Sequence, residues 1–269
     1  MLARDILTAM HLVAAVGGDP DLIQRLRDFR DGEQRFLVHP VSPVAIPALV
    51  DALRALDFAG ALLLDPRVQA EAARAVDRAS LDVRELGAAD ALVLTPAGTV
   101  ADQHLGRALG DVLRQRLWDP RGARAVVLGA DLPALAAARE LASLGVAHLT
   151  VLAHDRPEAE RLAARIPSPT TTVALAAAEG AALALLERAD MVVRSDPSAD
   201  LPPELFGPHL ALVDLVPGPL TAWRRRGLEV GALTVGARDV EAHRLHLGLT
   251  SVLGPGVALE AILSLLHEA

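Results

Sequence analysis

Apolar positions along this chain of 269 residues follow two spacings: short continuous runs, and stretches with apolar residues three and four positions apart. In the second half the two alternate regularly, with a run at residues 125–128, a helical stretch at 133–144 closed by Gly145, and another run at 148–152. The runs predict buried strands and the stretches predict helices. This order is typical of a parallel sheet, whose ligands bind beyond the carboxyl ends of the strands.

Patterning in the first half is less regular and still predicts both kinds of element. An opening helix is expected at residues 6–16, where the apolar spacing is helical and Gly17 and Gly18 end it. The turn-rich segment at residues 119–122 is a candidate domain junction. Further strands are expected at residues 35–39, 61–64, 91–95, 171–174, 191–194, 211–215 and 229–234, and further helices at 43–56, 68–79, 102–118, 156–165, 181–188, 219–226, 239–249 and 257–267.

Composition narrows the possible chemistry. The chain contains no lysine, no asparagine and no cysteine, so all 26 Lys+Arg residues are arginines. A guanidinium stays protonated, so proton transfer is left to carboxylates, the 9 histidines or a cofactor. A net charge of −8 disfavours nucleic acid as a partner. We also expect no membrane partner and a cytoplasmic location, because no apolar run approaches the roughly 20 residues of a membrane span and the first residues do not resemble a leader.

Several segments, in shared order, resemble the shikimate and quinate dehydrogenase family. Residues 87–91 are similar to its Gly-Ala-Val-Asn-Thr, residues 127–130 to its dinucleotide turn, residues 189–193 to its Ala-Asp-Leu-Val-Ile, and residues 213–221 to its Asp-Leu-Val-Tyr-Asn-Pro region. The resemblance implies an α/β fold with an N-terminal α/β substrate-type domain, formed by residues 1–104 with 237–269. It also implies a Rossmann-like doubly wound parallel-sheet domain for the dinucleotide, residues 105–236, and a small-molecule ligand in a cleft between the two.

The catalytic positions that this resemblance implies carry other residues. Val68 stands where the family's Val-Thr-x-Pro-x-Lys segment supplies its lysine. The Asn-Thr-Asp-x-x-Gly segment is matched by residues 101–106, which offer Asp102 for the partner aspartate. Asp102, with His104 beside it, is a candidate base for the proton of an alcohol, although the interpretation of Asp102 as a helix cap is preferred.

The substrate-binding positions are altered too. In the resemblance, residues 5–11 match the family's Ser-Leu-Ser-Pro-x-Met-His, so Asp5 replaces a serine that binds the substrate carboxylate. Because the chain begins almost at this motif, we expect the family's first strand to be missing and the sheet to be shorter. Asp90 replaces an asparagine and His243 a glutamine. Arg67 is a candidate for binding an anionic substrate.

The glycine turn that would bind the cofactor also differs. Gly129 and Ala130 match its start, but Asp131 stands where backbone amides meet the diphosphate. Like charges about 4 Å apart repel by about 1 kcal/mol in water and about 4 kcal/mol at an effective dielectric constant near 20. Asp131, followed by Pro133, is alternatively a helix N-cap.

Residues after the next strands are candidates for contacting the rest of a dinucleotide. His154, Asp155 and Arg156 replace the family's Asn-Arg-Thr, which binds the 2′-phosphate of NADP. Asp155 could bind the ribose of NAD, and Arg156 a phosphate. Ser195 lies in the segment matching the family's Asn-Ala-Thr. The cofactor therefore stays open among NADP, NAD and none.

Two functional hypotheses follow. The first is a divergent shikimate dehydrogenase-like paralogue, inactive on shikimate or binding another ligand. The second is an active NAD(P)-dependent oxidoreductase acting on shikimate, quinate or a related hydroxy acid through Asp102, His104 or His243. We expect no metal site, and either a monomer or a homodimer.

Overall fold

The structure is a computed structural model that describes residues 10–29, 36–76, 78–167, 169–218 and 220–267. The chain forms two compact units, residues 1–104 with 245–269 and residues 105–244. The division falls inside helix α10 (Ala237–Leu253), so residues 237–244 group with the second unit rather than with the first, where the sequence interpretation placed them.

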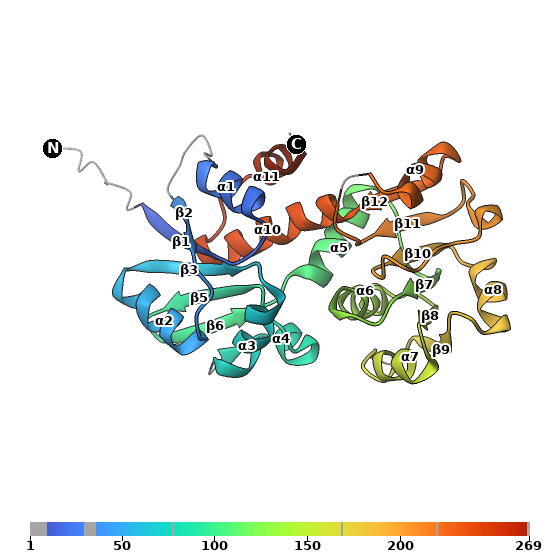
Figure 1. Ribbon diagram of the computed structural model, residues 1–269, viewed down its shortest axis with the longest axis horizontal. Helices are drawn as coiled ribbons and strands as arrows, with labels where there is room; N and C mark the ends of the chain where they lie inside the picture. Colours follow the sequence, from blue (N-terminus) through green and yellow to red (C-terminus); the bar gives the residue numbers. More distant parts are fainter. Residues whose placement is uncertain (1–9, 30–35, 77, 168, 219, 268–269) are drawn as a thin grey trace. The chain divides into compact units, whose positions relative to one another are not determined.

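The first unit is built on a six-stranded mixed sheet in the order β2-β1-β3-β5-β6-β4 (Figure 1). β1 pairs in parallel with β2 and β3, whereas β5 is antiparallel to β3 and β6. The strands are β1 (His11–Val16), β2 (Phe36–Val41), β3 (Phe58–Leu63), β4 (Arg78–Ala79), β5 (Ala91–Thr95) and β6 (Gly98–Asp102), and the helices are α1 (Pro20–Asp28), α2 (Ile46–Ala55), α3 (Pro66–Ala75), α4 (Leu81–Leu86) and α11 (Leu259–His267).

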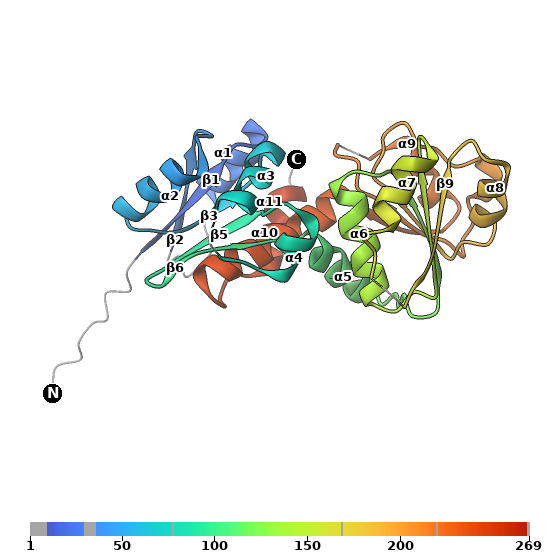
Figure 2. The same cartoon turned by 90° about the horizontal axis from the view of Figure 1, so that it is seen from below.

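Helices from the end of the chain pack with this first unit, so segments far apart in sequence lie side by side (Figures 1 and 2). Space for this packing is made by Gly60 of β3, where an added Cβ would lie 2.8 Å from Val252 Cγ1 of α10. Aliphatic side chains from β1, β3 and helices α2 and α3 form one core cluster. The first unit therefore combines residues 1–104 with residues 245–269.

The expectation for the start of the chain was wrong. His11–Val16 is a strand, and the described part of the predicted helix at residues 6–16 contains no helical residue. β1 is paired on both edges, and its residues 13–16 are all buried, so both faces of this part are covered and its sequence is an apolar run rather than an alternating one. The sheet of the first unit contains six strands among the described residues, with β1 in its interior.

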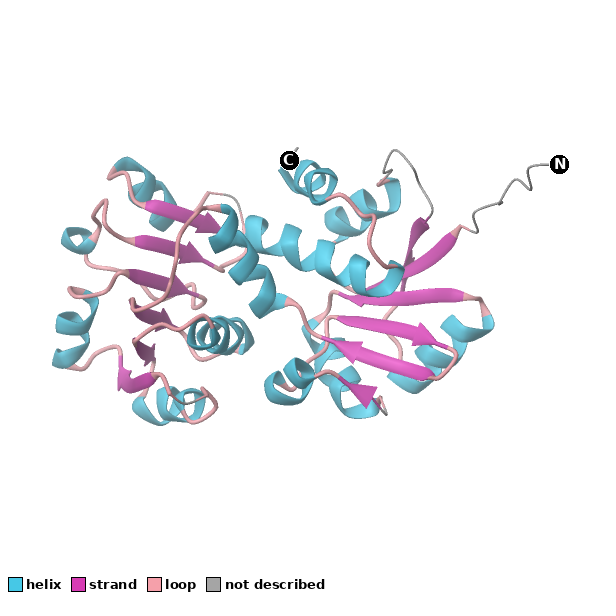
Figure 3. Ribbon diagram, turned by 180° about the vertical axis from the view of Figure 1, so that it is seen from behind, coloured by secondary structure: helices cyan, strands magenta, loops and turns pink. Residues whose placement is uncertain are grey.

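The second unit contains a six-stranded sheet in the order β12-β11-β10-β7-β8-β9 (Figure 3). All of its strand pairs are parallel, and the order reverses between β7 and β10 as in the doubly wound Rossmann arrangement. The strands are β7 (Arg124–Leu128), β8 (His148–Ala153), β9 (Thr171–Ala176), β10 (Met191–Arg194), β11 (Ala211–Asp214) and β12 (Leu233–Gly236), and the helices are α5 (Leu105–Gln115), α6 (Leu132–Ser143), α7 (Arg156–Ala163), α8 (Gly180–Leu186), the short η1 (Pro203–Leu205) and α9 (Ala222–Glu229).

Helix starts in this unit are set by polar side chains that bind exposed backbone N–H groups. Asp131 caps α6, Asp155 caps α7 and Thr221 caps α9. Since these caps follow β7, β8 and β11, the carboxyl ends of the strands and the N-termini of the helices meet at one edge of the sheet. No helix among the described residues is both long and apolar enough to cross a membrane.

A glycine pair tests this packing. In Gly60→Ala the new Cβ would lie 2.2 Å from the carbonyl oxygen of Leu92, so backbone must move, and we expect a loss of about 2 kcal/mol in unfolding free energy. Gly180 has no atom within 4 Å of an added Cβ and begins α8, so Gly180→Ala should be neutral or stabilise by up to about 1 kcal/mol. Urea unfolding of both variants measures the difference, and equal effects would contradict the packing described for β3.

Candidate functional site

The predicted cofactor residues lie together at the carboxyl edge of the second sheet. Gly129 follows β7, His154 follows β8 and Ser195 follows β10. These three strands are adjacent in the sheet, and the strand order reverses between β7 and β10. In doubly wound folds ligands bind in the crevice at this point. The edge is therefore the candidate nucleotide site.

The turn after β7 is tight because its glycine accommodates a neighbouring side chain. Gly129 has φ 131°, a backbone conformation that suits glycine, and an added Cβ would lie 2.2 Å from Ser195 Oγ. Ser195 is buried, and its hydroxyl donates to Leu128 O at 3.3 Å. Glycine is thus required here for packing against Ser195, whether or not a ligand approaches the turn.

Asp131 is the N-cap of helix α6. Its Oδ1 accepts a hydrogen bond from Ala134 N at 2.9 Å, and the residue is exposed. The carboxylate therefore binds one of the N–H groups at the helix start, where a diphosphate would be bound in the family's glycine turn. The capping interpretation of Asp131 is confirmed, and the side chain places a negative charge beside the turn.

The residues after β8 are also bound within the protein. Asp155 Oδ1 accepts from Glu158 N at 2.8 Å as the N-cap of α7. Arg156 forms a two-pronged ion pair with Glu179, with Arg156 Nε 3.0 Å from Glu179 Oε1. Hydrogen bonds with Arg156 and with the Ala176 N–H lower the pKa of Glu179. His154 is exposed, so of the three it is the one side chain for which no hydrogen bond or ion pair is observed at this edge.

A buried ion pair that the sequence did not predict joins β10 and β11. Arg194 Nε and Nη2 donate to the two carboxylate oxygens of Asp214 at 3.1 and 3.3 Å. The Arg194 guanidinium lies over the Trp223 ring, 5.4 Å from its centroid, and Asp214 also accepts from the hydroxyl of Thr221. The pair fixes the backbone that leads into Ser195.

The catalytic candidates of the first unit form a second site. His104 Nδ1 donates to Asp90 Oδ1 at 2.6 Å, and His104 Nε2 lies 3.2 Å from Asp102 Oδ2. The His104 N–H also donates to Asp90 Oδ2 at 2.9 Å. His104 is 0% exposed, whereas the Asp102 side chain is 20% exposed. The imidazole is therefore held inside the protein between two carboxylates, of which Asp102 is the more accessible.

Charges in this cluster stabilise one another. Burial alone would lower the pKa of His104, but its hydrogen bonds with Asp102 and Asp90 raise that pKa above its usual value of 6.5. Burial would likewise raise the pKa of Asp102, but the hydrogen bond and charge of His104 hold it well below its usual value of 3.8. The two carboxylates thus favour the protonated imidazole over the neutral one.

Ser251 of α10 completes the cluster and was missed by the sequence analysis. Its Oγ lies 2.8 Å from His104 Nε2 and 3.5 Å from Asp102 Oδ2. Ser251, His104 and Asp90 thus have the order of contacts found in serine hydrolase triads. Nucleophilic catalysis needs a neutral imidazole to take the serine proton, and here the two carboxylates favour the protonated ring. The serine therefore acts as a hydrogen-bond partner in this state.

Asp102 is the last residue of β6. Its Oδ1 accepts from Gln103 N at 2.8 Å, and its Oδ2 lies 3.2 Å from His104 Nε2. When Gly106 is taken as the glycine of the family's Asn-Thr-Asp-x-x-Gly segment, Gln103 rather than Asp102 falls on the aspartate. Gln103 is 2% exposed, and its Oε1 accepts from His104 N at 2.8 Å.

Val68, at the family's lysine position, is 5% exposed and belongs to the hydrophobic core of the first unit. Arg67 beside it is exposed at the start of α3. The position therefore offers a packed hydrocarbon in place of an amine.

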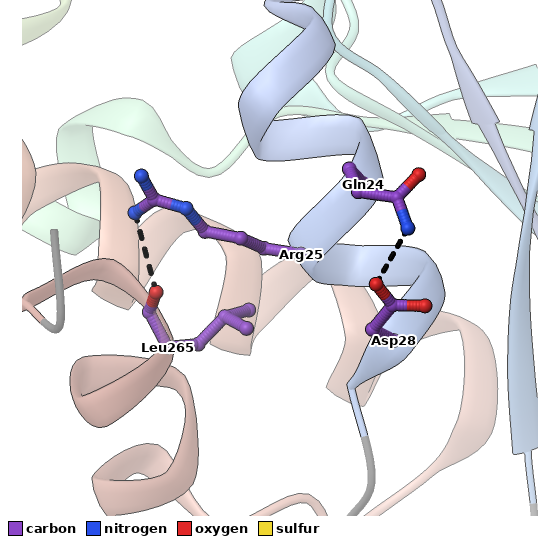
Figure 4. A pocket seen from close by; sticks show the side chains of 4 residues that line it. All are labelled: Gln24, Arg25, Asp28 and Leu265. Carbon is purple, nitrogen blue, oxygen red and sulfur yellow. Dashed lines mark hydrogen bonds between the residues drawn. The ribbon is translucent and has the colours of Figure 1, made fainter.

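The other predicted residues do not join these clusters. Asp5 lies outside the described residues. His243 belongs to the second unit and is buried, and its Nδ1 donates to Asp239 O at 2.9 Å in its own helix. A hollow of about 270 Å³ between α1 and α11 is lined by Gln24, Arg25, Asp28 and Leu265, none of which was predicted (Figure 4). Within the described ranges, no three His, Asp or Glu side chains are placed to hold a metal ion.

Comparison with known sequences finds shikimate dehydrogenases. The shikimate dehydrogenase (NADP(+)) of Paramagnetospirillum magneticum is 33% identical over 142 residues, which are 51% of this chain and 51% of that protein. The shikimate dehydrogenase (NADP(+)) of Moorella thermoacetica is 29% identical over 240 residues, covering 82% and 76%. The first match thus spans about half the length of that relative. No family model matches the chain.

Solved structures share the fold. Quinate dehydrogenase from Corynebacterium glutamicum, in complex with NAD, has a TM-score of 0.86 at 18% identity and covers 97% of this chain and 100% of its own. The 5-ketofructose reductase of Gluconobacter sp. strain CHM43 has a TM-score of 0.81 at 19% identity, with 96% and 98% covered. Shikimate 5-dehydrogenase from Thermus thermophilus, in complex with NADP(H) and shikimate, has a TM-score of 0.80 at 20% identity, with 96% and 99% covered.

The fold is that of the two-domain, Rossmann-containing dehydrogenases. Within that class the chain is similar to the shikimate and quinate dehydrogenases, which supply both the curated relatives and most of these structural neighbours. The Corynebacterium glutamicum and Thermus thermophilus structures contain NAD and NADP(H), respectively.

His104 is the residue whose replacement tests the cluster. In His104→Gln the Asp90 and Asp102 carboxylates lose their cationic partner, and we expect a loss of about 3 kcal/mol in unfolding free energy at pH 6. Because the folded-state pKa of His104 is raised, its contribution in the wild type is fully present below about pH 6.5 and is lost as pH rises through the folded-state pKa.

The wild type should therefore lose stability as the pH rises from about 6.5, whereas the His104→Gln variant should stay flat over this range. Urea midpoints measured from pH 5 to pH 9 give both curves. Parallel curves would mean that His104 is not protonated in the folded protein.

Proposed function

We propose that this chain is a divergent shikimate dehydrogenase-like protein that does not oxidise shikimate by the family's lysine–aspartate route. The observation that carries the proposal is the packing of Val68 and Gln103. Val68 is part of the core, and Gln103 is buried with its side-chain oxygen bound to His104 N. Neither side chain can exchange a proton with an alcohol, and no lysine elsewhere in the chain can replace the missing amine.

The candidate nucleotide site supports the same proposal. The strand order suits a nicotinamide dinucleotide, but the turn after β7 does not fit its diphosphate well. Asp131 is exposed beside the turn, and its carboxylate already binds the Ala134 N–H. A like charge about 4 Å away in water costs about 1 kcal/mol, which corresponds to about fivefold weaker binding. NAD or NADP is therefore expected to bind weakly, and the small-molecule ligand to differ from shikimate.

A matched pair of assays tests the proposal. The full chain should show no turnover of shikimate or quinate with NADP or NAD, under conditions in which the Paramagnetospirillum magneticum enzyme is active. Titration with both cofactors, followed by tryptophan fluorescence, should give weak binding. Asp131→Ser keeps a capping oxygen and removes the charge, so it should tighten binding about fivefold without loss of stability. Turnover comparable to that of the control enzyme would refute the proposal.

A second candidate function rests on the Asp102–His104–Asp90 arrangement. Asp102 would be the base, His104 would orient it, and Asp90 holds His104 in place. Asp102 is the most accessible of the three. In this alternative the protein is an active NAD(P)-dependent oxidoreductase in which Asp102 accepts the alcohol proton, with His104 sharing the charge. The acceptor's pKa is lowered, so proton transfer would depend on the coupled pair rather than on Asp102 alone.

Asp102→Asn separates this alternative from a structural role. If any hydroxy acid is turned over, kcat should fall by about a hundredfold or more while KM changes little, because the base acts in the transition state. Ser251→Ala removes a hydrogen bond to the same imidazole and serves as the matched control, with a much smaller effect on kcat. Equal loss in both variants would indicate a structural role for the cluster.

A further inference from the structure

The loop after α5 carries an exposed leucine in a conformation that glycine usually adopts. Leu117 has φ 56°, and 93% of its surface is exposed. Its N–H donates to Arg114 O, and Trp118 N–H donates to Leu113 O, both at 3.0 Å. Helix α5 thus ends in a Schellman motif, whose left-handed residue is most often glycine. Leucine adds backbone strain here and gains no burial within the chain.

A hollow lies directly beside this leucine. It has a volume of about 520 Å³, and Leu113, Leu117, Trp118 and Leu144 supply apolar lining. The volume is ample for a leucine side chain. All of these residues belong to the second unit, so the protruding side chain and the hollow lie on one continuous surface.

Charges around the hollow are balanced, unlike those of the chain as a whole. Arg114 pairs with Asp111 at 2.5 Å, and Arg121 pairs with Asp119 at 3.1 Å. The two arginine side chains are 69% and 78% exposed. With a net charge of −8, two copies of the chain repel each other over most of their surfaces. A surface that carries both signs equally can meet a copy of itself without that repulsion.

We propose that this surface, the Leu117 patch, is an interface between two copies of the chain related by a twofold axis. The patch consists of Leu113, Arg114, Leu117, Trp118, Arg121 and Leu144. In a twofold interface each copy offers the same surface, so a projecting side chain beside a hollow is self-complementary. Leu117 of each copy fills the hollow of the other, which explains an apolar side chain at a position that favours glycine. No residue of either candidate site takes part.

Replacement of Leu117 by glycine tests this interface without harming the fold. Glycine suits a φ of 56°, so Leu117→Gly should keep or raise the thermal midpoint of the separated chain while removing the projecting side chain. The control is Leu228→Ala, because Leu228 is 51% exposed on α9 and outside the patch. Sedimentation velocity of the full chain over a concentration series should show a dimer whose dissociation constant rises at least about tenfold in Leu117→Gly and stays unchanged in Leu228→Ala.

Trp118 provides a second readout. Its emission should shift to shorter wavelength as the dimer forms, whereas Trp223 is 3% exposed and contributes a constant background. A wild type that stays monomeric at every concentration would overturn the proposal. So would a dimer unaffected by Leu117→Gly, or a monomer whose Trp118 emission responds to a small amphipathic carboxylate, which would assign the hollow to a ligand.

Discussion

A buried imidazole held between two carboxylates is the constraint on which the first unit's chemistry depends. His104 ties the loop before β5, through Asp90, to the end of β6, through Asp102, and to α10, through Ser251. Taking three such groups out of water is costly unless each is paired and hydrogen-bonded. The cluster satisfies these groups with one another. It thereby raises the pKa of His104 and lowers that of Asp102.

Pairing of charged side chains within the protein also describes the candidate nucleotide site of the second unit. Asp131 and Asp155 cap helices, Arg156 is bound by Glu179, and Arg194 is bound by Asp214. Side chains at positions that contact ligands in the resembled family here bind the protein itself. A ligand at this edge must compete with these internal contacts, which is the physical basis for proposing a changed function on an unchanged fold.

Sequence patterning predicted the second unit well and the first unit less well. Most strands of the second sheet are short apolar runs, and local pattern is enough to place such elements. The strand predicted at residues 229–234 was misplaced, because α9 continues to Glu229 and β12 is Leu233–Gly236. The helix predicted over His11–Val16 was wrong because this apolar run has no spacing that distinguishes a helix from a strand. It is a strand because it pairs with two neighbouring strands. Asp102 was named as a candidate because residues 101–106 resemble the family's aspartate segment, but Ser251, 149 residues away, is brought to it only by tertiary packing. No local signal in the sequence indicates such a contact.

The protonation state of His104 tests the account most directly. Nitrogen-15 NMR of the imidazole in the full chain at pH 6, below the usual pKa of 6.5, distinguishes a doubly protonated ring from either neutral tautomer. The account predicts protons on both Nδ1 and Nε2, with both nitrogens resonating as an imidazolium. A neutral ring, with Nε2 free to accept a proton from Ser251, would contradict it.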